Sequence, residues 1–390
     1  MCRQQGGCQL NKGCKMTNGR DYPNRIPPYI APLTVRGRIS RVQPKGLPVV
    51  NLGFNELPYG PTPKVAEAMA ACALRANYYG SPGCDALRAA LATENQLDAE
   101  TIICGNGSEE LLDVIARNFA RPGDEILISQ FGYIQFEMTA NRLGATLIKA
   151  PEADFTTDVD ALLGAVSDRT RLVFLANPNN PTGTGLPVFE IKRLLDKMPA
   201  RVVVVLDLAY GEFTGAGYCA QMHELAQHYD NVVITRTFSK AFGLAGLRVG
   251  WANAPKWMLP GFYAARGMGS VNAMAQAAAV AALADIDIVQ DRVARIVRER
   301  GRVAGELSTL GVSALPSGAN FLLVSVDGAG AKVTEALVEY LFDHAGIIVN
   351  RTREAGLERF LRFCLGLPAD NDLLIACVAD FLQQGGITAR

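Results

Sequence analysis

Short apolar runs that alternate with helical stretches constrain the fold of this 390-residue chain more than any other feature. Runs in which every position is apolar are typical of strands buried on both faces, because helices packed over a parallel sheet cover both of its sides. Helical stretches such as Glu109–Phe119 and Phe189–Lys197 separate most of the runs. We therefore predict an α/β fold with a mostly parallel, helix-covered sheet. The predicted strands are Ile102–Cys104, Ile126–Ser129, Leu172–Ala176, Val202–Leu206, Val232–Thr235 and Val249–Ala252.

The pattern changes in the last quarter of the chain. A long charged helix is predicted over Ile288–Leu310, and strands are predicted near Phe321–Ser325 and Ile347–Asn350. This mixture predicts a smaller α+β domain over residues 288–390, which follows a large domain over residues 46–287.

Composition excludes several classes of protein. The 38 basic and 38 acidic side chains balance, whereas proteins that bind nucleic acids or anionic membranes need a basic surface. The apolar stretch Met274–Ala284 is too short to span a membrane and is followed by Asp285, which indicates a packed helix. No apolar run follows Arg3, so no secretory signal is predicted. We expect a cytoplasmic protein that binds neither nucleic acid nor membrane.

Residues 1–45 are rich in proline, glycine and arginine, and we expect an arm whose first part is disordered. The spacing of Cys2, Cys8 and Cys14, with no histidine nearby, does not match a metal site. Met16 is a hypothesis for the true start, which intact residues 1–15 on the native protein would contradict. The remaining cysteines are expected to be small buried hydrophobic residues. These are Cys72, Cys84, Cys104, Cys219, Cys364 and Cys377.

Polar residues follow four of the predicted strands, at the point where each strand ends. In an open parallel sheet, ligands bind beyond the carboxyl ends of the strands. We therefore expect these residues to gather in one site. The segments are Gly105–Glu109, Asn177–Gly183, Asp207 with Tyr210, and Thr237–Lys240.

The segment Gly105–Gly107 opens a predicted helix and suits a phosphate, since bare backbone N–H groups and the positive end of a helix attract an anion. An ordinary tight turn is the alternative. A dinucleotide-binding fingerprint fits poorly, because Glu110 stands where the third glycine is required. The next strand also ends in Ser129 and Gln130 rather than an acidic residue. We therefore do not expect a dinucleotide-dependent oxidoreductase.

Asp207 and Lys240 indicate chemistry most directly. A carboxylate at the end of an apolar strand is costly unless a cation pairs with it, and a protonated pyridine nitrogen would be such a partner. Lys240 shares a loop with Ser239 and Arg248, which together suit a phosphate ester. A lysine amine in that place can form a Schiff base with an aldehyde. Taken alone, each residue also has an ordinary interpretation, as a surface aspartate or a solvated lysine.

Together these motifs resemble the fold type I, class I and II aminotransferases that use pyridoxal 5'-phosphate (PLP), and specifically the histidinol-phosphate aminotransferase-like branch. The resemblance covers nearly the whole chain from about Ile26 onward. It implies an aspartate-aminotransferase-like fold with a large PLP-binding domain and a small C-terminal domain. The segments that carry it are Asn51–Pro61, Tyr79–Arg88, Asn177–Gly183, Thr237–Arg248, Ser317–Phe321 and Leu361–Phe363.

The resemblance implies a role for each residue of the expected site. Lys240 holds PLP through a Schiff base and later moves a proton, while Asp207 pairs with the pyridine nitrogen. Asn180 and Tyr210 hydrogen-bond the phenolic oxygen of the cofactor, and Tyr133 stacks on its ring. Active sites of this family form at a homodimer interface. The phosphate is held by backbone N–H groups of Gly107, Ser108 and Glu109, by Ser239 and Arg248, and by Tyr79 from the neighbouring subunit.

The substrate residues are also implied by the resemblance. Arg362 is expected to clamp a substrate anion, because an arginine fork fixes geometry as well as energy. A surface ion pair is its ordinary alternative. Asn320 is expected beside the same anion. Tyr29 is expected either in the substrate pocket or packed under the arm.

Two positions depart from the branch. Leu208 replaces an acidic residue that is not expected to touch the cofactor. Asn350 stands where the branch usually has an arginine that binds the substrate's phosphate. Arg351 or Arg353 could compensate, and the register decides, since adjacent strand residues face opposite ways. An uncharged Asn350 weakens the case for a phosphorylated substrate.

The sequence thus predicts a PLP-dependent aminotransferase that moves an amino group between a small-molecule amino donor and a 2-oxo acid. Histidinol phosphate with 2-oxoglutarate is one candidate pair, and an aromatic or other amino acid is an alternative donor. A PLP decarboxylase, lyase or oxidase on the same fold also stays open. A PLP-sensing regulator would need a DNA-binding module, for which residues 1–45 are too short and irregular.

Overall fold

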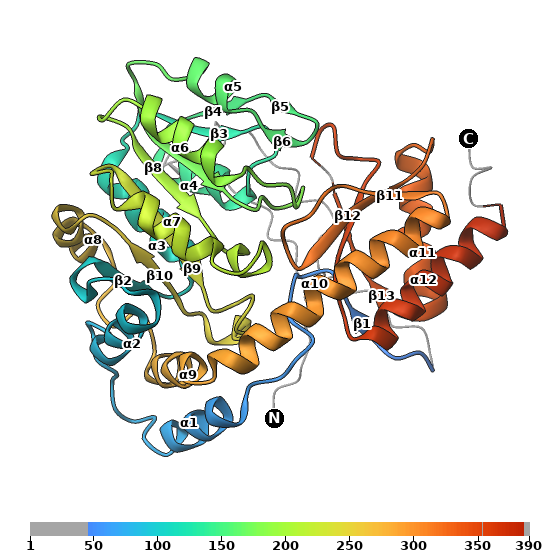
Figure 1. Cartoon of the computed structure of the whole chain (residues 1–390), viewed down its shortest axis with the longest axis horizontal. Coiled ribbons are helices and arrows are strands. Elements are labelled where there is room, and N and C mark those ends of the chain that lie inside the picture. Colours follow the sequence, from blue (N-terminus) through green and yellow to red (C-terminus); the bar gives the residue numbers. More distant parts are fainter. Residues whose placement is uncertain (1–45, 353, 386–390) are drawn as a thin grey trace, which may run out of the picture. The chain divides into compact units, whose positions relative to one another are not determined.

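The computed structural model describes residues 46–352 and 354–385, and its largest sheet has seven strands (Figure 1). The strand order is β2-β10-β9-β8-β7-β3-β4. Neighbouring strands are parallel except at β10, which is antiparallel to both β2 and β9. The strands are β2 (Ile102–Gly105), β3 (Glu125–Ser129), β4 (Thr146–Ala150), β7 (Thr170–Ala176), β8 (Val203–Asp207), β9 (Val232–Thr237) and β10 (Gly250–Asn253).

The prediction of a mostly parallel sheet is confirmed, and the six predicted strands are all present. The sequence did not predict β4, which lies at one edge of the sheet. Thr146 and Lys149 are exposed there and interrupt the apolar run. A short hairpin follows it, formed by β5 (Glu152–Ala153) and β6 (Thr156–Thr157).

Alternating side chains build an apolar layer on each face of the sheet. Phe174 and Val205 belong to one layer, whereas Val173 and Val204 belong to the other. This alternation follows from the two-residue period of a strand, and helices cover both layers. They are α3 (Ser108–Phe119), α4 (Ile134–Leu143) and α8 (Leu259–Ala265) on the first face, and α5 (Val159–Gly164), α6 (Val188–Lys197) and α7 (Tyr218–Ala226) on the second.

A second, four-stranded sheet is antiparallel and uses the C-terminal part of the chain. Its order is β11-β12-β15-β14. This content agrees with the predicted smaller α+β part, while the boundary between residues 287 and 288 stays a prediction. The elements are α10 (Ile286–Thr309), β11 (Val312–Ala314), β12 (Phe321–Val326), α11 (Ala331–Ala345), β14 (Asn350–Arg351), β15 (Leu361–Cys364) and α12 (Pro368–Gln383).

The single strand predicted over Ile347–Asn350 is wrong, because two short strands form there. β13 (Ile347–Ile348) pairs in parallel with β1 (Val50–Asn51). β14 instead joins the small sheet by pairing with β15. An apolar run cannot show that its two halves have different partners, since the pairing depends on segments far away in the sequence.

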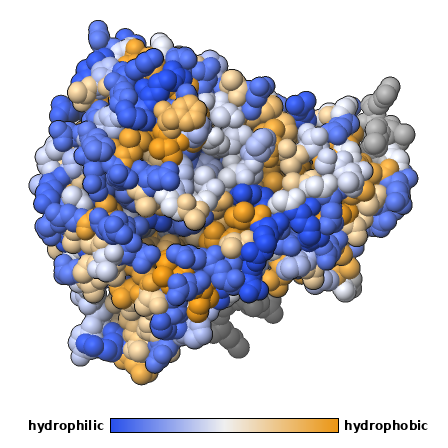
Figure 2. Space-filling model, viewed as in Figure 1, coloured by the Kyte–Doolittle hydropathy of each residue, from blue (hydrophilic) through white to orange (hydrophobic). Residues whose placement is uncertain are grey.

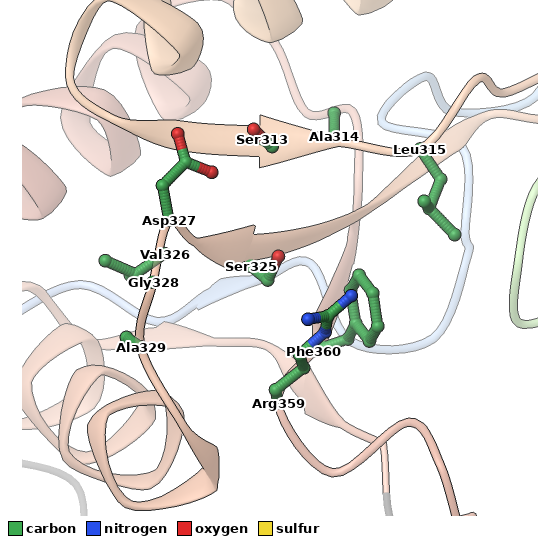
Figure 3. Close-up of a pocket in the computed structure, with 10 residues that line it drawn as sticks. All are labelled: Ser313, Ala314, Leu315, Ser325, Val326, Asp327, Gly328, Ala329, Arg359 and Phe360. Atoms are coloured by element: carbon green, nitrogen blue, oxygen red, sulfur yellow. The ribbon is translucent and has the colours of Figure 1, made fainter. Parts of the chain in front are cut away.

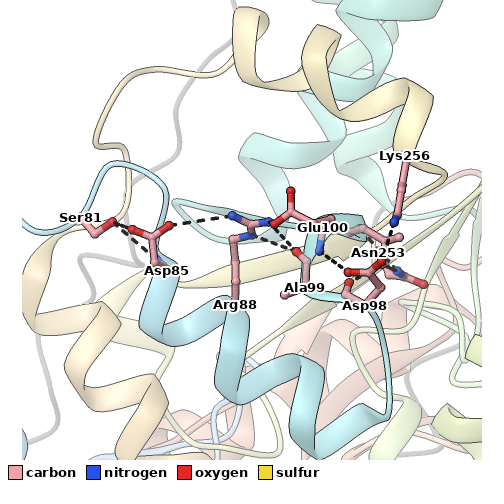
Figure 4. A network of polar contacts seen from close by, with 9 residues as sticks. Ser81, Asp85, Arg88, Asp98, Ala99, Glu100, Asn253 and Lys256 are labelled. Carbon is pink, nitrogen blue, oxygen red and sulfur yellow. Dashed lines mark hydrogen bonds and ion pairs between the residues drawn. The ribbon is translucent and has the colours of Figure 1, made fainter.

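A polar network holds the segment before β2 in place (Figure 4). Arg88 donates to the carbonyl oxygen of Ala99 at 2.6 Å and pairs with Glu100 at 2.8 Å. Asp98 pairs with Lys256 at 2.6 Å, and this contact lowers the pKa of the Asp98 carboxyl. Exposed ion pairs of this kind contribute little stability. Their main effect is to orient the start of β2, which leads into the Gly105–Gly107 loop.

Helix α9 (Ala273–Leu283) packs against α1 (Pro63–Ala73) and α2 (Asp85–Asn95). Its buried alanines agree with the packed helix predicted at this place. In the described part of the chain, no single helix is long and apolar enough to cross a membrane. Only α9 and α10 taken together, bent by 80° at their junction, pass by length and composition.

The cysteines differ in burial. Cys84, Cys104, Cys364 and Cys377 are buried as expected, but Cys72 and Cys219 are only partly buried. The predictions for Tyr29 and for the cysteines of the leader fall outside the described residues and stay predictions.

Candidate active site

One edge of the large sheet collects the residues that the sequence singled out. Six of its strands run in the same direction, so their carboxyl ends share this edge, and the antiparallel β10 begins there. Ligands of open α/β sheets bind at such an edge. The loops contribute Gly107 after β2, Tyr133 after β3, Asn180 after β7, Asp207 and Tyr210 from β8, Ser239 and Lys240 after β9, and Arg248 before β10.

The loop after β2 is shaped to hold an anion. Gly107 directly precedes α3 and has a φ of +79°, a conformation that favours glycine. A Cβ atom at this position would lie 2.6 Å from Nη2 of Arg248, so a side chain here would displace the guanidinium. The Arg248 guanidinium also donates to the Ser239 hydroxyl at 3.4 Å. A helix N-terminus, an arginine and a hydroxyl thus face the same place.

Asp207 is a buried carboxylate at the end of β8. Its Oδ1 accepts a hydrogen bond from the Thr235 hydroxyl at 2.9 Å. Burial raises the pKa of Asp207 to about 6, and the nearby Glu109 carboxylate acts in the same direction. The Thr235 bond and the positive charge of Lys240 offset only part of this effect. A cation placed against the carboxylate would therefore be strongly favoured.

The Lys240 amine lies above the end of the sheet. Its Nζ donates to the carbonyl oxygen of Asn55 at 3.1 Å and lies 5.7 Å from the centre of the Tyr210 ring. Both neighbours are neutral, so the amine can change partners without breaking an ion pair. This freedom suits a lysine that reacts with a carbonyl group.

Asn55 is the residue that sequence reasoning missed as a member of this site. Its side-chain amide donates to the Tyr210 hydroxyl at 2.9 Å. Its carbonyl oxygen accepts from Lys240 and from the Asn320 amide at 3.2 Å. The Oδ1 atoms of Asn55 and Asn320 are buried without a protein partner. The N-terminal motif that contains Asn55 was the available indication, but no spacing rule assigns it a contact.

Arg362 on β15 points towards the end of the large sheet. Its guanidinium donates to Oδ1 of Asn180 and to the carbonyl oxygen of Gly53. The carbon of the guanidinium lies 5.4 Å from the centre of the Phe321 ring. Burial lowers the pKa of Arg362, and its Nε atom is buried without a protein partner. A desolvated arginine with a free donor suits an anionic ligand.

The register of the small sheet decides which residues share a face with Arg362. Asn350 on β14 lies directly opposite Arg362 on β15, so both side chains project to the same face. Arg351 projects to the other face and pairs with Glu335. Arg351 therefore cannot compensate for Asn350, and Arg353 lies outside the described residues.

Tyr133 and Glu109 are in direct contact. The Tyr133 hydroxyl donates to Glu109 at 2.7 Å. Burial holds the pKa of Tyr133 well above its usual value, and the Glu109 carboxylate is the second largest cause of this shift. Tyr133 is therefore a hydrogen-bond donor with a fixed ring, as a residue that stacks on a ligand requires.

Tyr79 is the predicted site residue that this chain does not bring to the others. Its side chain is fully exposed. Within one copy of the chain it can have no role in the site, which is consistent with the expectation that it acts in a neighbouring subunit.

A cavity of about 400 Å³ lies elsewhere, on the small sheet between β11, β12 and the residues before β15 (Figure 3). Its polar lining includes Ser313, Ser325, Asp327 and Arg359. None of the residues that the sequence singled out lines it. The convergence of side chains at the sheet edge therefore remains the better candidate for a catalytic site.

Comparisons with known proteins agree with this geometry. The family model "Aminotransferase class I and II" matches residues 48–378. Histidinol-phosphate aminotransferase of Rhodospirillum centenum is 40% identical over 86% of this chain and 92% of that protein, and that of Erythrobacter litoralis is 42% identical over 86% and 91%. The crystal structure of histidinol-phosphate aminotransferase from Sinorhizobium meliloti in complex with pyridoxal-5'-phosphate is 32% identical, with a TM-score of 0.82 over 86% of this chain and 91% of that one.

Proposed function

The chain belongs to the class I and II aminotransferase family, and we propose that it is a PLP-dependent histidinol-phosphate aminotransferase. It would transfer the amino group of L-histidinol phosphate to 2-oxoglutarate. The observation that carries this proposal is that Lys240 and Asp207 lie at one edge of the large sheet. Gly107 and Arg248, which are proposed to hold the phosphate, lie at the same edge. The names of the relatives, at about 40% identity over most of the chain, support this substrate.

The residues at the edge fit PLP in three respects. The N-terminus of α3 at Gly107, the Arg248 guanidinium and the Ser239 hydroxyl lie together, which suits a phosphate. Asp207 is a buried carboxylate that needs a cationic partner, as a pyridinium nitrogen provides. The Lys240 amine donates to neutral carbonyl oxygens, those of Phe54 and Asn55. When bound, PLP supplies an aldehyde for this amine and a ring that withdraws electrons from the substrate carbon.

Each side chain then has a defined task. The Nζ atom of Lys240 takes and returns the proton of the substrate carbon. Asp207 would keep the ring nitrogen of PLP protonated, and Tyr133 would pack against its ring. Asn180 and Tyr210 would hydrogen-bond its phenolic oxygen. The N–H groups of Gly107, Ser108 and Glu109 and the side chains of Ser239 and Arg248 would hold its phosphate.

Arg362 is proposed to bind the substrate's anionic group. Its present partners are the neutral oxygens of Asn180 and Gly53, so an anion would make stronger bonds with the same donors. Asn320 lies close to Lys240, because both residues donate to the carbonyl oxygen of Asn55. Asn350 lies on the same face of the small sheet as Arg362 and adds no charge there.

Asn350 favours a second candidate, an aminotransferase that acts on aromatic or other amino acids. In the part of the chain that the structure describes, Arg362 faces the proposed anion site, and the residue opposite it, Asn350, is uncharged. Single donors added without an oxo acid distinguish the two. We expect L-histidinol phosphate to bleach the absorbance of the PLP form rapidly. If phenylalanine or glutamate bleached this absorbance and L-histidinol phosphate did not, the second candidate would be favoured. A yellow protein that no donor bleaches would contradict transamination and leave a PLP decarboxylase, lyase or oxidase.

Asn350→Arg is expected to lower KM for L-histidinol phosphate by roughly tenfold, since an added charge-assisted bond to phosphate contributes about 1.5 kcal/mol. The value of kcat should change little, because the contact is far from the reacting carbon and is made equally in the ground state. Arg351→Ala is the matched control, since Arg351 faces Glu335 on the other side of the sheet. Equal effects of the two variants on KM would contradict the placement of Asn350.

We also propose that two copies of the chain form a homodimer with shared active sites. Leu74, Tyr78, Tyr79 and Met268 are large apolar residues that lie exposed in one copy. Hydrophobic side chains gather in several patches on the face drawn in Figure 2 as well. A dimer would bury such surface and carry Tyr79 to the neighbouring phosphate. Sedimentation equilibrium should give twice the chain mass. Tyr79→Ala should weaken PLP binding. A monomer with full activity would contradict the proposal.

A further inference from the structure

We propose that the side chain of Glu109 is a positioning group that joins the two halves of the cofactor site. One half is Tyr133, which packs over the ring, and the other is Arg248, which binds the phosphate. This inference rests on the proposed function. It assigns the Glu109 carboxylate a role that is separate from the role of its backbone N–H group.

The two carboxylate oxygens of Glu109 have different partners. Oε1 accepts the hydroxyl proton of Tyr133 at 2.7 Å. Oε2 accepts from Nη2 of Arg248 at 3.3 Å, and the two groups form an ion pair. Glu109 belongs to the first turn of α3, Tyr133 precedes α4, and Arg248 precedes β10. One side chain therefore connects three elements at the site.

The contact with Tyr133 is the stronger of the two. Burial and the Glu109 carboxylate both keep the phenol protonated, so the hydroxyl remains a donor to a charged oxygen. Phe136 packs edge-on against the Tyr133 ring, with 5.7 Å between the ring centres. The hydroxyl bond and this packing together fix the plane of the ring that would lie over the cofactor.

The contact with Arg248 orients a side chain that is otherwise weakly held. The other hydrogen bonds of its guanidinium, to Ser239 and to the carbonyl oxygen of Ala245, are both 3.4 Å long. Arg248 also has a φ of +53°, which disfavours residues with a Cβ atom. A nearby carboxylate repels a phosphate, but this one is paired with the arginine that is proposed to bind the phosphate. We therefore infer that its positioning effect outweighs the repulsion.

Glu110 provides a matched control. It lies in the same first turn of α3, so its charge acts on the helix dipole as that of Glu109 does. Its Oε2 atom, however, accepts from the backbone N–H of Asn106 at 2.6 Å. Replacing Glu110 alters the helix start but leaves the contacts of Glu109 with Tyr133 and Arg248 in place.

The experiment measures the rate at which PLP leaves the loaded protein, and the visible circular dichroism of the bound cofactor. Glu109→Ala should release PLP roughly tenfold faster or more and change the dichroism, because two charge-assisted contacts are lost. Glu109→Gln keeps an acceptor for Tyr133, so its rate of PLP release should lie between the rates of Glu109→Ala and of the wild-type protein. Tyr133→Phe should speed release on its own but have little further effect in the Glu109→Ala background.

Two outcomes would overturn the inference. Glu109→Ala could release PLP no faster than Glu110→Ala, which would show a helix effect only. Slower release from both Glu109 variants would show that the carboxylate chiefly opposes the phosphate. If the wild-type protein did not bind PLP at all, the proposed function would be contradicted instead. The experiment therefore distinguishes failure of this inference from failure of the proposed function.

Discussion

Lys240→Ala is expected to lower turnover by roughly 10⁴-fold, because proton transfer by a positioned base alone contributes about 10²- to 10⁴-fold. The same substitution removes the amine that holds the cofactor covalently. The fold should persist, since the hydrogen bonds that Nζ of Lys240 donates to the carbonyl oxygens of Phe54 and Asn55 are with neutral groups, and their loss leaves no buried charge unpaired. The loss should therefore appear in kcat rather than in the free energy of unfolding.

Borohydride reduction followed by mass spectrometry checks the covalent link. The unchanged protein should retain one PLP per chain on the peptide that contains Lys240, and the variant should retain none. Lys256→Ala is the control, because Lys256 pairs with Asp98 at the far end of β2 (Figure 4). Cofactor trapped on another lysine, or a variant with normal turnover, would refute the assignment of Lys240.

Much of the large sheet could be predicted because its strands are buried on both faces. Val203–Asp207 and Thr170–Ala176 are nearly uniform apolar runs, and burial of both faces is what produces them. The strand β4 lacks this pattern because Thr146 and Lys149 are exposed, whereas β2 at the opposite edge is fully buried and was predicted. The separate pairing of β13 and β14 was missed because a two-residue strand carries no period at all.

The site was predictable to the extent that its residues follow strands. Asp207 ends β8, and Asn180 and Lys240 follow β7 and β9 within a few residues, so the sheet topology brings all three to the same edge. Asn55 and the side chain of Glu109 could not be found in this way. Their contacts join segments that no periodicity relates, such as the 155 residues between Asn55 and Tyr210.

Asp207 is expected to make the stability of the cofactor-free protein depend on pH. Burial raises the pKa of its carboxyl from 3.8 to about 6, so the folded protein holds this proton more tightly than the unfolded chain. Stability falls with rising pH wherever the folded state binds more protons. The contribution of Asp207 should therefore lower the free energy of unfolding by about 2 kcal/mol between pH 4 and pH 7. Bound PLP should abolish this loss, because the pyridinium partner stabilises the ionised carboxylate.

Asp207→Asn separates the catalytic effect of this carboxylate from its effect on stability. The variant should unfold at higher denaturant concentration than the unchanged cofactor-free protein at pH 7, since no buried charge remains, and the slope with pH should flatten. Its turnover should nevertheless fall roughly 10²- to 10³-fold, because a neutral amide cannot keep the ring nitrogen protonated. Thr235→Val is the comparison, as it removes the 2.9 Å bond to Oδ1 but leaves the carboxylate in place. If Asp207→Asn were less stable and fully active, the carboxylate would be a structural partner of Thr235 and the pyridine nitrogen would have to be held by another group.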